Sequence, residues 1–274
     1  MIEFRCRARD RHKNPVVSNV EIQEYAEALV GDYKPSLLNE PSAINPLHFV
    51  ESYLGATVDY QDIFYKEGEP PIAGATVFND DVVPVFDREH MCVRNIPVSA
   101  NTILIDNAIL EKGKEGFCNF TVLHEGGHFT MHPEIFRRDD SQISLLPEMF
   151  SPHPRVACRK NAIGASVPYG QFWTPEQRRE HQANVFAAFI AMPKKTFFPF
   201  AQELVKKAGF SEGVYIEHDE YDWCNDDPLY NIGNKLATTY GVSRTAATIH
   251  MRTLGLVQSK DEYMASRSQT VVAF

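Results

Sequence analysis

The stretch FTVLHEGGH occupies residues 120–128 of this chain. It is apolar at its leading end and Pro133 follows it, so we expect a helix from about residue 119 to residue 132. Side chains four residues apart lie above one another on an α-helix. His124 and His128 can therefore direct both imidazoles at one point, as two zinc ligands on one helix must.

Glu125 lies one position round the helix, so it flanks the predicted metal rather than binding it. In this place a carboxylate acts as a general base, which takes a proton from the water activated by zinc and passes it to the leaving amine. The next two residues, Gly126 and Gly127, together cost about 1.5–2 kcal/mol relative to alanines inside a helix. That cost indicates that a substrate strand or a facing helix approaches this face closely.

A catalytic zinc has three protein ligands and an open fourth position. His132 follows His128 by four residues, but three histidines in one column span about 12 Å, which is too far for one ion. We therefore expect His132 beside the ligands or at the helix end. Glu180 is the better third ligand, because it lies on a second strong helix whose alanines allow close packing against the two glycines. Asn184, one turn later, is expected to orient a ligand imidazole.

Short β-rich runs precede the motif helix and are separated by glycine, proline, asparagine and aspartate. They cover residues 57–60, 72–78, 82–86 and 102–105, with a hairpin turn expected at residues 79–81. A small, mostly antiparallel sheet is therefore predicted to pack on the motif helix. The expected fold class is α+β, with a helical C-terminal part.

Capping boxes mark the start of two helices, at Ser18 with Glu21 and at Thr174 with Gln177. Periodicity and stop signals place the expected helices at residues 18–31, 45–55, 174–193, 196–208, 229–240 and 244–254. Residues 133–173 have no clear period and are interpreted as an inserted loop. We divide the chain into an N-terminal helical segment (1–44), a peptidase core (45–193) and a C-terminal helical region (194–274).

The chain has 274 residues and a net charge of −9. This acidic balance disfavours broad binding of nucleic acid or anionic membranes, because phosphate contacts need clustered Lys and Arg. Five scattered cysteines without a CxxC pair indicate reduced thiols. There is neither a secretory signal nor an apolar run of ~18 residues. We therefore expect a cytoplasmic protein.

These motifs resemble those of the ImmA/IrrE-type metallopeptidases of bacteria and their mobile elements. The likeness rests on FTVLHEGGH with His132 following it, and on EHQANVFAA at residues 180–188, which leads into Met192-Pro193. VPVFD at residues 83–87 and TILID at residues 102–106 are similar to the family's sheet segments, and residues 236–256 to its helical tail. The likeness covers about residues 45 to 257.

The resemblance implies a zincin-like fold with His124, His128 and Glu180 as ligands of one zinc ion and Glu125 as the base. Family members typically cleave helix-turn-helix repressors, which relieves repression, so the expected partner is such a protein. This sequence departs from the family in two places. Gly126 replaces a larger apolar residue, which predicts a wider cleft, and the stretch before Glu180 is longer than is common, so the insertion is expected to gate the cleft or select the substrate.

Two other functions compete with proteolysis. Residues 236–254 have the outline of a helix-turn-helix, which would suit a DNA-binding regulator with a structural or vestigial metal site. The second helix offers only Arg244, His250 and Arg252 for contacts with DNA, so a pair that packs on the core or holds a protein partner fits better. The other alternative is a non-proteolytic antirepressor that traps its partner.

Four residues remain open as stabilisers of an oxyanion, because no spacing argument separates them. They are His153, Tyr169, His218 and Tyr221.

Overall fold

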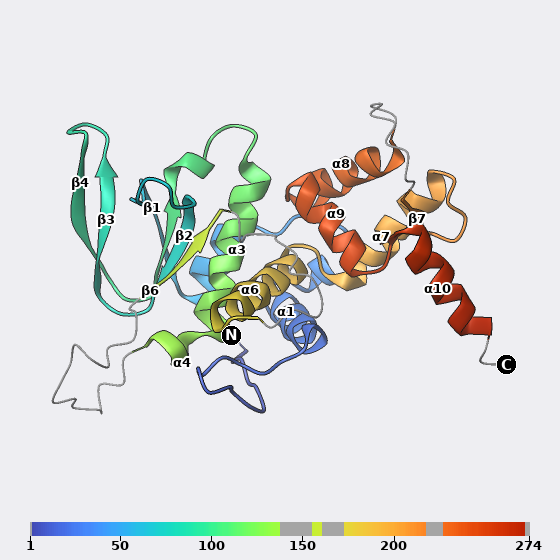
Figure 1. Ribbon diagram of the computed structural model, residues 1–274, viewed down its shortest axis with the longest axis horizontal. Coiled ribbons are helices and arrows are strands. Elements are labelled where there is room, and N and C mark those ends of the chain that lie inside the picture. Colours follow the sequence, from blue (N-terminus) through green and yellow to red (C-terminus); the bar gives the residue numbers. More distant parts are fainter. Residues whose placement is uncertain (1, 138–154, 161–172, 218–226, 272–274) are drawn as a thin grey trace.

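The computed structural model describes residues 2–137, 155–160, 173–217 and 227–271. They form a mixed α/β fold in which most of the helices lie to one side of a small sheet (Figure 1). No helix of these described ranges is both long and apolar enough to cross a membrane.

The main sheet has four strands in the order β1-β5-β2-β6. Their bounds are β1 (Thr57–Gln61), β2 (Ile72–Val77), β5 (Thr102–Asp106) and β6 (Arg155–Arg159). β1 runs parallel to β5, whereas β2 is antiparallel to both β5 and β6. β5 is buried along its whole length, and β2 from its second residue onward, which matches their place inside the sheet.

A separate hairpin consists of β3 (Asp81–Asp87) and β4 (Cys92–Val98), and it projects from the sheet at the far left of Figure 1. The predicted hairpin turn at residues 79–81 was therefore wrong: β2 pairs with β5 and β6, while β3 pairs with β4. β4 escaped prediction because it is exposed along most of its length and lacks an apolar run.

The prediction of a structureless insertion at residues 133–173 was wrong in two places. The short helix α4 (Pro133–Phe136) continues from the motif helix after a break at His132. β6 lies further along the same stretch and pairs with β2 through Val77, Thr76, Ala75 and Gly74. The insertion thus adds a strand to the sheet, and main-chain hydrogen bonds hold that strand whatever its side chains are.

The motif helix is α3 (Glu115–Met131), and it lies between the sheet and α6 (Pro175–Ala191) (Figure 1). α1 (Asn19–Tyr33) packs on the far side of α6. Both predicted capping boxes are present, at Ser18 with Glu21 and at Thr174 with Gln177. The first fixes where α1 begins, and the second, with Pro175 at the first position, fixes the start of α6.

The remaining elements are short or C-terminal. They are η1 (Pro35–Leu38), α2 (Pro46–His48), the π-helical turn η2 (Phe49–Leu54), η3 (Asn107–Ile109), α7 (Lys194–Lys207), β7 (Tyr215–Ile216), α8 (Pro228–Tyr240), α9 (Arg244–Thr253), β8 (Val257–Gln258) and α10 (Lys260–Val271).

One hydrophobic core includes residues of all three predicted segments, from Ile22 on α1 to Val257 on β8. The α8–α9 pair packs on the motif helix, where Asn119 Nδ2 donates to the carbonyl of Gly241 at 2.8 Å. A Cβ at Gly116 would overlap the backbone of Val242 and Ser243. The interpretation of this pair as a unit that packs on the core is therefore confirmed, while the segment boundaries stay a prediction.

His250 links α9 to the end of α6 through a buried ring that can titrate. Its Nε2 donates to the carbonyl of Met192 at 3.0 Å, and its ring contacts Phe189 and Phe197 edge-on. Burial lowers the pKa of His250 to about 4, from 6.5 in the unfolded chain. The unfolded chain therefore binds the extra proton between these two values, so this contribution is complete above pH 6.5 and is lost as the pH falls towards 4.

We expect the free energy of unfolding to fall by about 2 kcal/mol between pH 7 and pH 5 on account of this histidine. His250→Gln keeps an N–H donor for Met192 but cannot titrate, so it should lack this part of the decrease. Urea unfolding of both proteins at the two pH values measures the difference. Equal pH dependence in the two proteins would contradict the assignment.

Candidate metal centre

His124 and His128 lie on the buried face of α3, and neither side chain is exposed. The one-turn spacing brings His124 Nε2 and His128 Nε2 to 3.0 Å from each other. The two rings point the same nitrogen at a common point, as the sequence spacing predicted.

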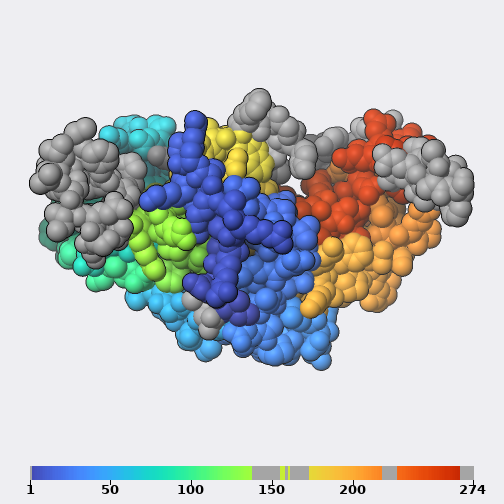
Figure 2. Space-filling view, turned by 90° about the horizontal axis from the view of Figure 1, so that it is seen from below, coloured from blue at the N-terminus to red at the C-terminus, as the bar shows by residue number. Residues whose placement is uncertain are grey.

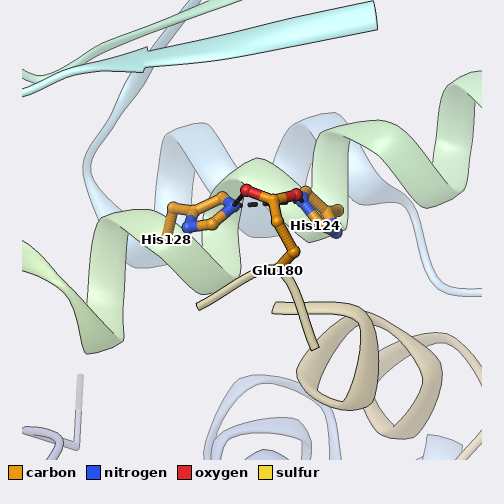
Figure 3. A group of neighbouring side chains, drawn as sticks. All are labelled: His124, His128 and Glu180. Atoms are coloured by element: carbon orange, nitrogen blue, oxygen red, sulfur yellow. Dashed lines mark hydrogen bonds and ion pairs between the residues drawn. The ribbon is translucent and has the colours of Figure 1, made fainter. Parts of the chain in front are cut away.

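Glu180 reaches this point from α6 (Figure 3). Its Oε2 is 3.3 Å from His124 Nε2, and its Oε1 is 3.4 Å from His128 Nε2. Among the described residues, these three side chains are the group that could hold a metal ion, with donor atoms within 4.8 Å of one another. The prediction that Glu180 joins the two histidines is confirmed in its geometry.

The close approach of α6 to α3 depends on Gly127. A Cβ at this position would lie 3.1 Å from Cδ1 of Phe186 and 3.2 Å from Cα of Ala183. The lack of a side chain at Gly127 thus allows the two helices to pack closely, and this packing positions the Glu180 carboxylate next to the two histidines. Of the two explanations for the glycines, the facing helix is confirmed here.

Gly126 has a different role from the one expected. A Cβ there would lie 3.3 Å from both Leu54 Cδ1 and Val50 Cγ2, which belong to η2. Gly126 is therefore buried against the core, and the prediction that it widens the cleft was wrong.

The donor set fits zinc in kind and in spacing. Two imidazoles and one carboxylate form a common catalytic set, and ligand atoms roughly 2.0–2.1 Å from a tetrahedral zinc lie about 3.3 Å apart. The separations of 3.0, 3.3 and 3.4 Å between the donor atoms here are close to that value. Burial raises the pKa of the Glu180 carboxyl, but the neighbouring imidazoles of His128 and His124 outweigh it and hold this pKa well below its usual range.

Each of the two histidines in this group has a partner on its other ring nitrogen. His124 Nδ1 lies 2.9 Å from Asn184 Oδ1, so Asn184 orients this imidazole as predicted. His128 Nδ1 lies 3.0 Å from His132 Nδ1. His132 is fully buried beside the donor group at the end of α3, and burial, which disfavours the charged form, lowers its pKa well below the usual value. Both placements agree with the predictions for Asn184 and His132.

The side chain of Glu125 extends from α3 towards β2, where a residue of the strand donates a hydrogen bond to its carboxylate. Thr76 Oγ1 donates to Glu125 Oε2 at 2.7 Å, whereas Oε1 has no hydrogen-bond partner among the described residues. A Cβ at Gly74 would lie 2.8 Å from that free oxygen, so the glycine leaves room for it. Burial raises the pKa of Glu125 to about 7, which suits a group that accepts and returns a proton near neutral pH.

No protein-family model and no curated protein sequence matches this chain.

Three residues of the centre were missed in the sequence. Gly74 and Thr76 alternate on one face of β2, and that i, i+2 spacing was the available signal. Gln182 lies two residues after Glu180 and accepts a hydrogen bond from His132. No sequence pattern predicts this contact. The candidate oxyanion residues His153, Tyr169, His218 and Tyr221 all lie outside the described residues.

Proposed function

We propose that this chain is a zinc-dependent endopeptidase with His124, His128 and Glu180 as metal ligands and Glu125 as the catalytic base. One observation carries the proposal. A buried carboxylate, with one oxygen that has no hydrogen-bond partner among the described residues, lies next to three converging donors on the same helix pair, and burial raises its pKa to about 7. A purely structural zinc site needs four protein donors and no adjacent base.

When bound, zinc supplies Lewis-acid chemistry, lowering the pKa of water and polarising a peptide carbonyl. Glu125 takes the proton of the attacking water on its free Oε1 and returns it to the leaving amine, while Thr76 fixes the other oxygen. His124 is kept in one orientation by Asn184. These roles produce hydrolysis of an amide bond without a covalent intermediate on the protein.

We propose a helix-turn-helix repressor as the substrate and the cytoplasm as the compartment. The support is the resemblance of the HEGGH and EHQAN motifs to ImmA/IrrE-type peptidases. A DNA-binding role for α8–α9 is less well supported, because Arg244 lies over the ring of Tyr230 and Arg252 pairs with Glu217. Both arginines are thus engaged within the protein, and α9 offers few cations for phosphates.

Metal analysis is the first test of the centre. We expect about one zinc per chain in the wild type and a loss of bound zinc in His124→Ala and Glu180→Ala, since three protein ligands are needed to retain the ion. Elemental analysis after dialysis against a weak chelator measures it. His181→Ala, next to Glu180 but outside the donor group, is the matched control and should keep its zinc. Zinc absent from the wild type would overturn the proposal.

Cleavage of purified repressors of the helix-turn-helix class tests the substrate. Fragments identified by mass spectrometry, absent after chelation and restored by zinc, are the expected result. Rapid digestion of unfolded casein would instead indicate a peptidase of broad specificity.

A further inference from the structure

The N-terminal segment (residues 8–17) folds back on itself and lies against α4 and α6. Arg9 pairs with Pro15 through a β-bridge, and its guanidinium forms an ion pair with Glu134 on α4 at 2.7 Å. Asn14 is fully buried and accepts a hydrogen bond from Arg179 of α6 at 3.2 Å. Figure 2 shows the N-terminal residues, in dark blue, lying across this face of the molecule. The segment is therefore fixed in place on the helix that carries Glu180.

From this segment a chain of buried hydrogen bonds leads to the metal centre. Gln182 Nε2 donates to the carbonyl of Pro15 at 2.8 Å. Gln182 Oε1 lies 3.0 Å from His132 Nε2, and His132 Nδ1 lies 3.0 Å from His128 Nδ1. Gln182 is 3% exposed and both histidines are fully buried, so water does not offer these groups alternative partners.

The donor and the acceptor of each hydrogen bond in this chain follow from the first bond, between Gln182 and Pro15. A backbone carbonyl can only accept, so the amide nitrogen of Gln182 faces Pro15 and its oxygen faces His132. That oxygen can only accept, so His132 carries its hydrogen on Nε2. A neutral imidazole with a hydrogen on Nε2 has a lone pair on Nδ1, which then accepts from His128 Nδ1. His128 is left with its lone pair on Nε2, the nitrogen that faces His124 and Glu180.

We propose that Gln182 is a positioning residue of the metal centre, which through His132 holds His128 in the tautomer whose Nε2 can bind zinc. The carbonyl of Pro15 fixes the amide of Gln182, so the N-terminal segment belongs to the outer part of the centre. The inference rests on the metal centre of the proposed function, but it concerns affinity for zinc and not catalysis.

Two substitutions of similar size separate this role from simple packing. Gln182→Met removes the acceptor that faces His132 and leaves a buried N–H without a partner, so we expect zinc affinity to fall about 10–100-fold. Gln182→Glu in its protonated form still accepts from His132 and donates to Pro15, so its affinity should stay within about threefold of the wild type. Competition with a chromophoric chelator measures the dissociation constants.

A double variant tests whether Gln182 acts through His132. His132→Leu cuts the same chain, so adding Gln182→Met to it should cause little further loss of zinc affinity. His181→Gln is the matched control on α6, because His181 Nε2 contacts Asn19 at 2.9 Å and His181 is not a member of the donor group. It should bind zinc as the wild type does.

The outcomes also distinguish this inference from the proposed function. If the wild type binds zinc and Gln182→Met binds it equally well, the inference is wrong and the metal centre stands. If the losses of zinc affinity from the two single substitutions simply add in the double variant, Gln182 acts on packing alone. That result would also overturn the inference. If the wild type binds no zinc, the proposed function itself fails.

Discussion

Glu125→Gln should reduce hydrolysis by about 10²–10⁴-fold, the range that a general base contributes. Glutamine fills the same space beside Gly74, and its carbonyl can still accept from Thr76, so the fold should be unchanged. What it lacks is an oxygen that can take up a proton. Initial rates on a cleavable repressor, with each protein at full zinc content, measure the effect.

Partner binding separates the peptidase from an antirepressor that only traps its target. Glu125→Gln should still bind the repressor, since the carboxylate is buried and contributes no exposed surface. If relief of repression in cells persists with this variant, proteolysis is not the mechanism. Unchanged cleavage in vitro would remove Glu125 from the role of base.

Gly127→Leu should destabilise the fold and abolish zinc binding together. A side chain at this position must push α6 away from α3, because a Cβ alone would already be 3.2 Å from the backbone of Ala183. Overpacking of a core typically costs about 1–3 kcal/mol. The displacement would also take the Glu180 carboxylate away from both histidines. Urea unfolding and zinc analysis of the same sample measure the two losses.

Gly127→Ala provides the comparison for this variant. One methyl group needs shifts of only a few tenths of an ångström, and alanine favours the helix by roughly 1 kcal/mol relative to glycine. We therefore expect nearly unchanged stability and retained zinc. A leucine variant that binds zinc like the alanine variant would show that the contact between the helices does not position Glu180.

The parts of the centre that were predicted from sequence all lie on helices with strong local signals. His124 and His128 are one turn apart, and that spacing fixes their relation without knowledge of the rest of the fold. The Thr174 capping box sets the start of α6 and thereby the face on which Glu180 and Asn184 lie. Local rules of helix geometry were sufficient for these residues.

The parts that were missed depend on contacts between distant segments. Thr76 meets Glu125 across 49 residues of chain, and Gln182 meets Pro15 across 167. Strand pairing is equally non-local. The β-rich runs on either side of Asn79 were predicted to form one hairpin, but β2 pairs with β5 and β3 pairs with β4. A single sequence carries no signal for which of several apolar strands will pair, since each of them shows the same alternation of buried and exposed side chains.

β2 is an interior strand, with β5 on one side and β6 on the other. An extended peptide therefore cannot add itself to the strand that holds Glu125; of the described strands, the free edge on this side is that of β6. β6 belongs to the insertion, so this edge of the sheet is encoded apart from His124, His128 and Glu180. Substitutions in that stretch would therefore alter this edge of the sheet without changing the three donor residues.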